Sequence, residues 1–277
     1  MSRKLAAISE IAVHAITFFS SSRQKNKTLA RVLKKLSEKS YASVACRNGR
    51  LKFNQLKSPH AASAVEHFFK DEPETLSWID TFDEGQTFFD VGAGLGLYSL
   101  YAALNHSLEI VSFEPNGFNF GLLVEHIHLN DMSMNIRPFC VALGDKSEVE
   151  NLMFNQVSEG AGGSSFQEAF YQRHKKEPLF SQAVLSFSLD DFIRTFGIRS
   201  PDHVKVDVDG LEPAIIAGAE RTLDTVSSVM LEVEMENLEN VNDLIEKPLA
   251  RLGFEESYEF QGLGSGRNRL YRKQKKS

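Results

Sequence analysis

The sequence predicts an α/β fold in which a mostly parallel sheet is covered by helices on both faces. Three observations support this. Short apolar runs alternate with helix-like segments from residue 87 onward. These runs are almost continuously apolar, as expected of strands buried on both faces. A glycine-rich turn joins the first run to its helix. The composition, 42% hydrophobic and 25% charged, is that of an ordinary globular chain.

Two regions are predicted along the chain. Residues 1–82 are expected to form an N-terminal extension of helices and a hairpin, and residues 83–277 the α/β domain. Apolar residues at helical spacing predict an amphipathic helix over 5–19. The Asn48-Gly49 pair between two short runs predicts the hairpin. We expect the extension to cap the ligand site or to form a homodimer contact.

The remaining elements follow from local patterns. A polar joint is predicted at 20–28, and helices on both sides of Pro73. Ser188 is expected to open a helix, and the stretch 149–170 is expected to be irregular. The predicted strands are 87–92, 109–115, 136–145, 203–210 and 227–234, with a closing pair at 255–260 and 268–273. The predicted helices of this region are 96–106, 118–131, 188–197, 212–223 and 240–254.

Charge and cysteine content exclude several classes of protein. A net charge of −6 argues against a nucleic-acid binder, and the basic run at 272–276 is interpreted as a solvated tail. The two cysteines, Cys46 and Cys140, form no metal-binding pattern and fit a reducing cytoplasm. Glu10 and His14 interrupt the first apolar stretch, so no signal peptide or transmembrane segment is predicted.

The glycine turn "DVGAGLG" predicts a nucleotide-type ligand with a cationic end. Gly92, Gly94 and Gly96 allow a tight turn in which the ligand approaches the backbone. A dinucleotide fingerprint would carry its third glycine one residue later, which disfavours an NAD dehydrogenase. Asp90 would repel a pyrophosphate but suits an amino group or a sulfonium. A glycine turn made only for packing is the alternative.

Two further strand ends suggest a nucleoside. Glu114 ends the second strand, about one helix and one strand after the glycine turn, where an acid can accept both ribose hydroxyls. A solvated acid at a strand end is the alternative. In "CVALGD", Ala142 and Leu143 are positioned to flank an adenine ring and Asp145 to reach its amino group, although this signal alone also fits a plain turn.

Together these segments resemble the FkbM-type methyltransferases. The resemblance covers roughly residues 70–235 and is carried by "FFDVGAGLGLYSLYAA", "IVSFEPN", "VALGD", "GGSSF", "SLDDF" and "VKVDVDGLEPAIIAGAERTL". It implies a Rossmann-like class I fold with a seven-stranded sheet and S-adenosylmethionine (SAM) as cofactor. Asp209 stands where many members have glutamate. The predicted cofactor-binding residues are Asp90, Gly92, Ala93, Gly94, Gly96, Glu114, Pro115, Asn116, Ala142, Leu143 and Asp207.

The predicted chemistry centres on "HVKVDVDG". Asp207 is expected to act as base or orienting group beside the methyl acceptor, and Lys205 to pair with a carboxylate or orient the substrate. The alternative is a Lys–Asp network that holds the strand end, with Asp209 and Glu212 supporting the next helix. No metal is assigned, but a magnesium site built from strand-end acids is a second alternative; its ligands would be Asp207, Asp209, Glu232 and Glu234.

The sequence thus predicts a SAM-dependent O-methyltransferase. The resemblance implies a hydroxyl acceptor on a sugar, polysaccharide or secondary metabolite. The loop at 158–166 is expected to cover the site, or else to be a plain surface loop. Two alternatives remain open: a methyltransferase acting on a protein or lipid group, and a catalytically silent SAM-binding protein that serves as an interaction subunit.

Overall fold

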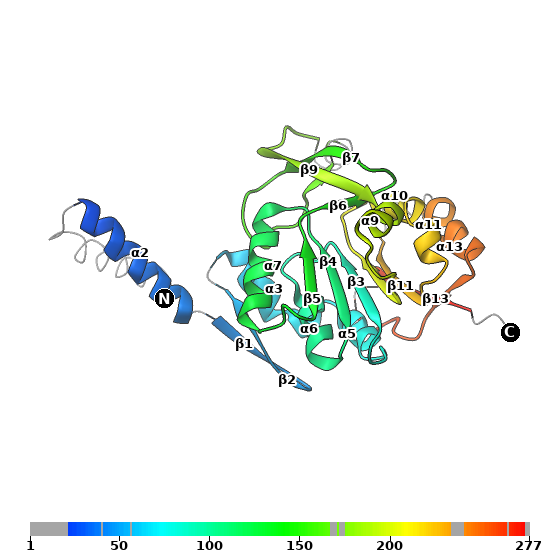
Figure 1. Cartoon of the computed structure of the whole chain (residues 1–277), viewed down its shortest axis with the longest axis horizontal. Helices are drawn as coiled ribbons and strands as arrows, with labels where there is room; N and C mark the ends of the chain where they lie inside the picture. The colour runs from blue at the N-terminus through cyan, green and yellow to red at the C-terminus, as the bar shows by residue number, and fades with distance from the viewer. Residues whose placement is uncertain are drawn as a thin grey trace.

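The computed structural model describes residues 22–39, 41–55, 57–166, 171, 175–233, 241–264 and 266–274. Its centre is a seven-stranded sheet in which the five strands from β5 to β11 run parallel and β13 runs antiparallel to both of its neighbours. The predicted fold class and the closing pair are therefore confirmed (Figure 1). The order across the sheet is β12 (Phe254–Ser257), β13 (Asn268–Lys273), β11 (Ser228–Glu232), β10 (His203–Val206), β3 (Thr87–Val91), β4 (Glu109–Phe113) and β5 (Ile136–Phe139).

Helices cover both faces of this sheet, because successive strand residues point to opposite sides. Phe89 of β3 belongs to a core shared with the later helices, whereas its neighbour Phe88 belongs to a core shared with the earlier ones. The later helices are α9 (Leu189–Phe196), α10 (Glu212–Ala217), α11 (Glu220–Leu223), the π-helix η2 (Asn242–Glu246) and α13 (Lys247–Arg251). The earlier ones are α3 (Pro59–Glu66), α4 (Phe68–Asp71), α5 (Pro73–Ile79), α6 (Leu97–Asn105) and α7 (Gly117–Leu129).

A second, four-stranded sheet corrects two sequence predictions. Its order is β6 (Ala142–Gly144), β9 (Phe180–Ser188), β7 (Glu148–Phe154) and β8 (Ser165–Phe166). The single strand predicted over 136–145 is wrong, because this segment forms two strands in different sheets. Its first half joins the large sheet as β5, and its second half pairs with β9 as β6. The stretch 149–170, predicted to be irregular, holds most of β7, whose partner β9 lies some 30 residues further on.

The N-terminal region packs on the large sheet through its hairpin. Strands β1 (Tyr41–Cys46) and β2 (Gly49–Asn54) pair around the predicted turn, and Phe53 of β2 is buried against the ring of His126 in α7. Helices α3 to α5 contribute to the same core, with Trp78 completely buried. The boundary placed at residue 82 stays a prediction.

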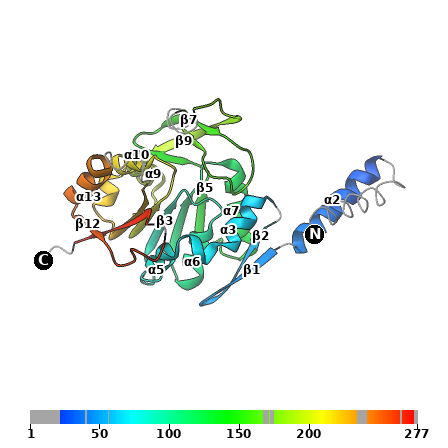
Figure 2. The ribbon, with the colours of Figure 1, turned by 180° about the vertical axis from the view of Figure 1, so that it is seen from behind.

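Helix α2 (Ser22–Lys39) projects from this body in both views (Figure 1, Figure 2). It begins inside the segment 20–28, so the polar joint predicted there is wrong from residue 22 onward. The helix predicted over 5–19 lies outside the described residues. None of the helices in the described part of the chain combines the length and apolar character needed to cross a bilayer. Capping or dimerisation by the extension stays a prediction.

The predicted start of α9 is confirmed and can be tested. The Ser188 hydroxyl accepts a hydrogen bond from the backbone N–H of Asp191. We expect Ser188→Ala to lower the free energy of unfolding by about 1 kcal/mol, because an N–H of the first turn loses its partner. Ser188→Thr keeps the cap and serves as the control. Urea denaturation measures both, and equal losses in the two variants would contradict the capping role.

Candidate active site

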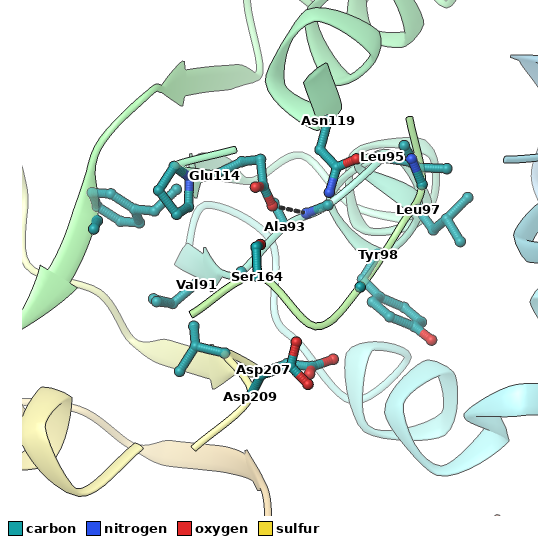
Figure 3. A pocket seen from close by; sticks show the side chains of 18 of the residues that line it. Val91, Ala93, Leu95, Leu97, Tyr98, Glu114, Asn119, Ser164, Asp207 and Asp209 are labelled. Carbon is teal, nitrogen blue, oxygen red and sulfur yellow. Dashed lines mark hydrogen bonds between the residues drawn. The ribbon is translucent and has the colours of Figure 1, made fainter. Parts of the chain in front are cut away.

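A cavity of about 320 Å³ opens at the carboxyl edge of the parallel strands (Figure 3). In folds of this kind, ligands bind at that edge, and volumes of this size hold small molecules. The ends of β3, β4 and β10 form its floor, and β6 and the loop before β8 form further walls. Asp71 and Glu72 of the N-terminal region also line it. The cavity therefore draws on both predicted regions of the chain.

The glycine turn shapes one side of this cavity. The backbone N–H groups of Gly92 and Ala93 both donate to the Phe113 carbonyl, at 2.9 and 3.0 Å. A Cβ on Gly92 would lie 1.8 Å from the Asp207 carbonyl oxygen, so only glycine fits there. Gly92, Ala93 and Gly94 line the cavity as predicted from the sequence. Gly96 does not, because it faces the Leu123 side chain and begins α6.

Glu114 is a buried carboxylate on the cavity wall. Its Oε2 accepts from the Gly94 N–H at 2.7 Å and its Oε1 from the Asn116 N–H at 2.8 Å (Figure 3). Burial raises the pKa of Glu114 to about 7, although the two backbone hydrogen bonds oppose this shift. Pro115 also lines the cavity. Asn116 does not, because its side chain caps α7.

An apolar wall lies next to Glu114. Ala142 and Leu143, predicted to flank a purine, both line the cavity beside Val141. These two residues line the cavity because they belong to β6, which lies at the edge of the small sheet. Asp145, predicted to reach the same ring, is exposed and does not line the cavity. A flat apolar ring would therefore meet side-chain carbons here.

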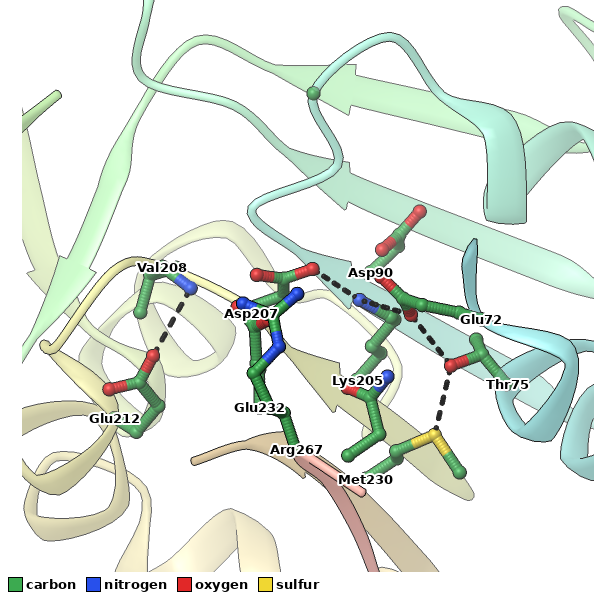
Figure 4. Close-up of polar contacts among 12 residues, drawn as sticks. Glu72, Thr75, Asp90, Lys205, Asp207, Val208, Glu212, Met230, Glu232 and Arg267 are labelled. Atoms are coloured by element: carbon green, nitrogen blue, oxygen red, sulfur yellow. Dashed lines mark hydrogen bonds and ion pairs between the residues drawn. The ribbon is translucent and has the colours of Figure 1, made fainter. Parts of the chain in front are cut away.

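Lys205 is the centre of a buried charge cluster beneath the cavity (Figure 4). Its ammonium lies 2.7 Å from Asp207 Oδ2, 3.4 Å from Glu72 Oε2 and 4.8 Å from the centre of the Tyr98 ring. Burial acts to lower the pKa of Lys205, but the carboxylates of Asp207, Glu72 and Asp90 outweigh it and hold this pKa above its ordinary value. Lys205 does not line the cavity, so it can act on a ligand only through Asp207 or Glu72.

Asp90 also lies below the cavity surface rather than in it. The side chain is 1% exposed, and its Oδ2 accepts from the Ser99 hydroxyl at 2.6 Å. Ser99 and Ser112 are hydrogen-bonded in turn at 2.7 Å. Burial raises the pKa of Asp90, and the nearby Lys205 ammonium opposes this rise. The direct contact with a cationic ligand group that the sequence suggested for Asp90 is therefore not available in this geometry.

Asp207 and Glu232 share a hydrogen bond at the ends of β10 and β11. Burial acts to raise the pKa of Asp207, but the Lys205 ammonium and the hydrogen bond from Glu232 outweigh it and lower this pKa. Burial and the charge of Asp207 raise the pKa of Glu232 to about 8, with Arg267 as partial compensation at 3.1 Å. The Lys205 ammonium thus favours the ionised form of Asp207, and the charge of Asp207 in turn favours the protonated form of Glu232.

Glu72 is the residue of this cluster that sequence reasoning missed. It lies in the segment "KDEPETLSWI", within the resemblance to the FkbM-type proteins, and its carboxylate also accepts from the Thr75 hydroxyl at 2.7 Å. The only available signal was an acid directly before a helix-opening proline, which is common at helix starts. Its partner Lys205 is 133 positions away in the chain, so no local pattern reveals the pair.

Asp209 and Glu212 have different roles. Glu212 accepts from the N–H groups of Val208 and Gly210 and so braces the turn before α10, which is the role that the alternative interpretation gave it. Asp209, with φ of 58°, instead accepts from the Gly163 N–H at 2.9 Å and holds the loop after β7 against the site. Across the described residues, no three carboxylate, imidazole or thiol side chains are placed to hold a metal ion, and Glu234 lies outside those residues.

The loop over 158–166 lies against the cavity through several hydrogen bonds. Gly160 donates its N–H to Asn119 Oδ1 at 2.8 Å, and the Ser58 hydroxyl donates to the Glu159 carbonyl. Residues of this loop line the cavity: Gly160, Ala161, Gly162, Ser164 and Phe166. The loop therefore covers the site in this conformation, and its mobility stays a prediction.

The raised pKa of Glu114 gives a testable pH dependence. Because the folded-state pKa of about 7 lies above the ordinary value of 4.5 for a glutamate, the stabilisation from this group is complete below about pH 4.5 and is lost as pH rises through about 7. We expect the stability difference between the wild type and Glu114→Gln to fall by up to about 3 kcal/mol across this window. Urea denaturation at a series of pH values measures it, with the exposed Glu220→Gln as control; a flat difference would contradict the burial argument.

Two solved structures are among those to which this chain is similar. The solved structure of the methyltransferase FkbM from Methylobacillus flagellatus KT aligns with a TM-score of 0.47 and 15% identity, over 69% of this chain and 44% of its own. Fibrillarin of Aeropyrum pernix, solved with S-adenosyl-L-methionine bound, aligns with a TM-score of 0.45 and 11% identity, over 84% of this chain and 82% of its own.

Sequence comparison gives the family. The hexuronic acid methyltransferase AglP of Haloferax volcanii is 24% identical over 156 residues, which are 56% of this chain and 59% of that protein, so the chain spans little more than half the length of this relative. The model of the methyltransferase FkbM domain matches residues 90–260, which is more than half of the chain. The chain therefore belongs to the FkbM methyltransferase family.

Proposed function

We propose that this protein is a SAM-dependent O-methyltransferase that acts on a hydroxyl of a sugar, polysaccharide or secondary metabolite. One observation carries the proposal. Glu114, a buried carboxylate suited to two ribose hydroxyls, and Asp207, an ionised carboxylate suited to an acceptor hydroxyl, line the same cavity on opposite sides of the glycine turn (Figure 3). The hexuronic acid named for the Haloferax relative supports a sugar-type acceptor.

The cavity residues fit a nucleoside with an amino acid tail. In our proposal the adenine packs on Ala142 and Leu143, the ribose hydroxyls donate to Glu114, and the methionine part follows the backbone of Gly92 to Gly94. Ionised Glu114 has lone pairs left after its two backbone hydrogen bonds. The bound cofactor would supply a methyl group already activated by the positive charge of its sulfonium.

The residues of this chain would then align the acceptor and remove its proton. The acceptor hydroxyl donates a hydrogen bond to Asp207, which directs an oxygen lone pair toward the methyl carbon. The bound cofactor would supply the methyl group for the new C–O bond and keep the electrons of its C–S bond on sulfur, and Asp207 would accept the hydroxyl proton and release it to solvent. Lys205 keeps Asp207 ionised and fixed without touching the substrate, which makes it a positioning residue.

The proposed compartment is the cytoplasm. Both cysteines, Cys46 and Cys140, are free thiols in the structure. Free thiols persist in a reducing compartment, where disulfides are rare. SAM is made inside cells, so a SAM-dependent enzyme and its cofactor would meet there.

Binding of SAM tests the cofactor assignment. The ribose needs ionised Glu114, so we expect SAM to bind more tightly as pH rises from about 6 to about 8, through the Glu114 pKa of about 7. Glu114→Gln removes the charge and is expected to weaken binding about 10- to 100-fold at the upper pH and to abolish this pH dependence. Calorimetric titration with SAM and NAD side by side measures it. Unchanged affinity in the variant, or preference for NAD, would refute the assignment.

Turnover tests the role of Asp207. Asp207→Asn keeps the side-chain shape but cannot take the acceptor proton, so we expect kcat to fall about 100-fold or more while SAM still binds. Methyl transfer from radiolabelled SAM to p-nitrophenyl β-D-glucoside is the readout. Glu220→Gln on the surface is the control, and full turnover by Asp207→Asn would remove this residue from the mechanism.

A further inference from the structure

The lining of the cavity carries only one sign of charge. Among its described residues five are carboxylic acids, and none is Lys, Arg or His; the acids are Asp71, Glu72, Glu114, Asp207 and Asp209. The Lys205 ammonium against Asp207 and Glu72 and the single net positive charge of the proposed cofactor together balance two of these five carboxylates at most. The remaining acids face whatever second molecule enters the cavity.

These acids are divided between two ends of the cavity. Glu114 stands beside the apolar wall that we assign to the nucleoside. Asp207 and Asp209 lie across the cavity from it, at the end of β10 (Figure 3). Asp71 and Glu72 enter from the N-terminal region, which is the part of the chain before the glycine turn. The acidic end is therefore built from two distant segments, and it lies beside Asp207, where the methyl acceptor must be.

Lys205 and Arg267 contact carboxyl groups of the protein and do not line this end of the cavity. The Lys205 ammonium is buried beneath the cavity against Asp207 and Glu72. The Arg267 guanidinium lies 3.1 Å from Glu232 and does not line the cavity. A negatively charged acceptor would therefore meet like charges without a cationic side chain from the described lining in contact with it, and like charges brought together at a binding site are strongly unfavourable.

Hydrogen bonding leads to the same conclusion. An ionised carboxylate can only accept hydrogen bonds and offers about four acceptor sites, so the lining acids can accept donors from a ligand in addition to their partners in the protein. Hydroxyl and ammonium groups supply donors, and an ammonium adds opposite charge. A carboxylate on the acceptor carries no donor at neutral pH. It would therefore form no hydrogen bond with Asp71, Asp207 or Asp209, and it would itself need water molecules as donors.

We infer that the acceptor is a neutral or amino-bearing polyhydroxyl compound, such as a neutral sugar or an amino sugar, and that acidic sugars are rejected. This inference rests on the proposed function. It separates the chain from its Haloferax relative, whose name specifies a hexuronic acid. Acceptor choice would then be set by the acids at 71, 72 and 209, outside the glycine turn that holds the cofactor.

Three matched glycosides test the inference with the full-length protein. The p-nitrophenyl β-D-glucoside, its 2-amino-2-deoxy analogue and the glucuronide differ in one substituent. Their binding to protein saturated with S-adenosylhomocysteine and their methylation by radiolabelled SAM are measured at low ionic strength. We expect the neutral or the amino glycoside to exceed the glucuronide about tenfold or more. A glucuronide that equals or exceeds both would overturn the inference, and so would the failure of all three to bind.

A charge reversal at one lining acid provides the second arm. Asp71→Lys places a cation at the acidic end outside the proposed catalytic machinery, and we expect it to raise glucuronide binding relative to glucoside binding about fivefold or more. Asp83→Lys, an exposed position before the first parallel strand, is the matched control and should leave the ratio unchanged. Equal ratios in the two variants would contradict the inference. A protein that binds no SAM would instead refute the proposed function, which keeps the two failures apart.

Discussion

The buried ammonium of Lys205 is the contact on which the site depends. It stands between Asp207 of the parallel sheet, Glu72 of the N-terminal region and Asp90 under the glycine turn, so one cation joins three segments that are far apart in sequence. Without it, three carboxylates would share a buried space, and removal of one partner from such a cluster costs about 3–5 kcal/mol. The cluster therefore explains both the ionisation of Asp207 and the position of the segment before α5.

Around this cluster, the ends of three neighbouring strands contribute different parts of the cavity lining. The end of β3 leads into the glycine turn, whose backbone a ligand can approach closely, the end of β4 carries Glu114, and the end of β10 carries Asp207. The burial that raises the pKa of Glu114 to about 7 is opposed at Asp207 by Lys205. The pKa values of the two carboxyl groups therefore shift in opposite directions because their partners differ, although both groups are buried.

The sequence predicted the features that are encoded locally. The parallel sheet, the hairpin at Asn48-Gly49 and the cap at Ser188 all follow from patterns within a few residues. The small sheet was missed because β7 and β9 become strands through long-range pairing. The depth of Asp90 could not be predicted for a related reason: its position before the glycines was evident, but its burial beneath the turn depends on packing against α6. Glu72 was invisible because its partner is distant in the chain.

The proposed function requires that the cavity binds a nucleoside across the glycine turn, with Glu114 at its ribose. A crystal structure of the protein with S-adenosylhomocysteine would locate the ligand. We expect both ribose hydroxyls within about 3.2 Å of the Glu114 carboxylate, with the adenine on Ala142 and Leu143 and the sulfur on the side of Asp207. A ligand bound outside this cavity, or turned so that its ribose faces Asp207, would contradict it.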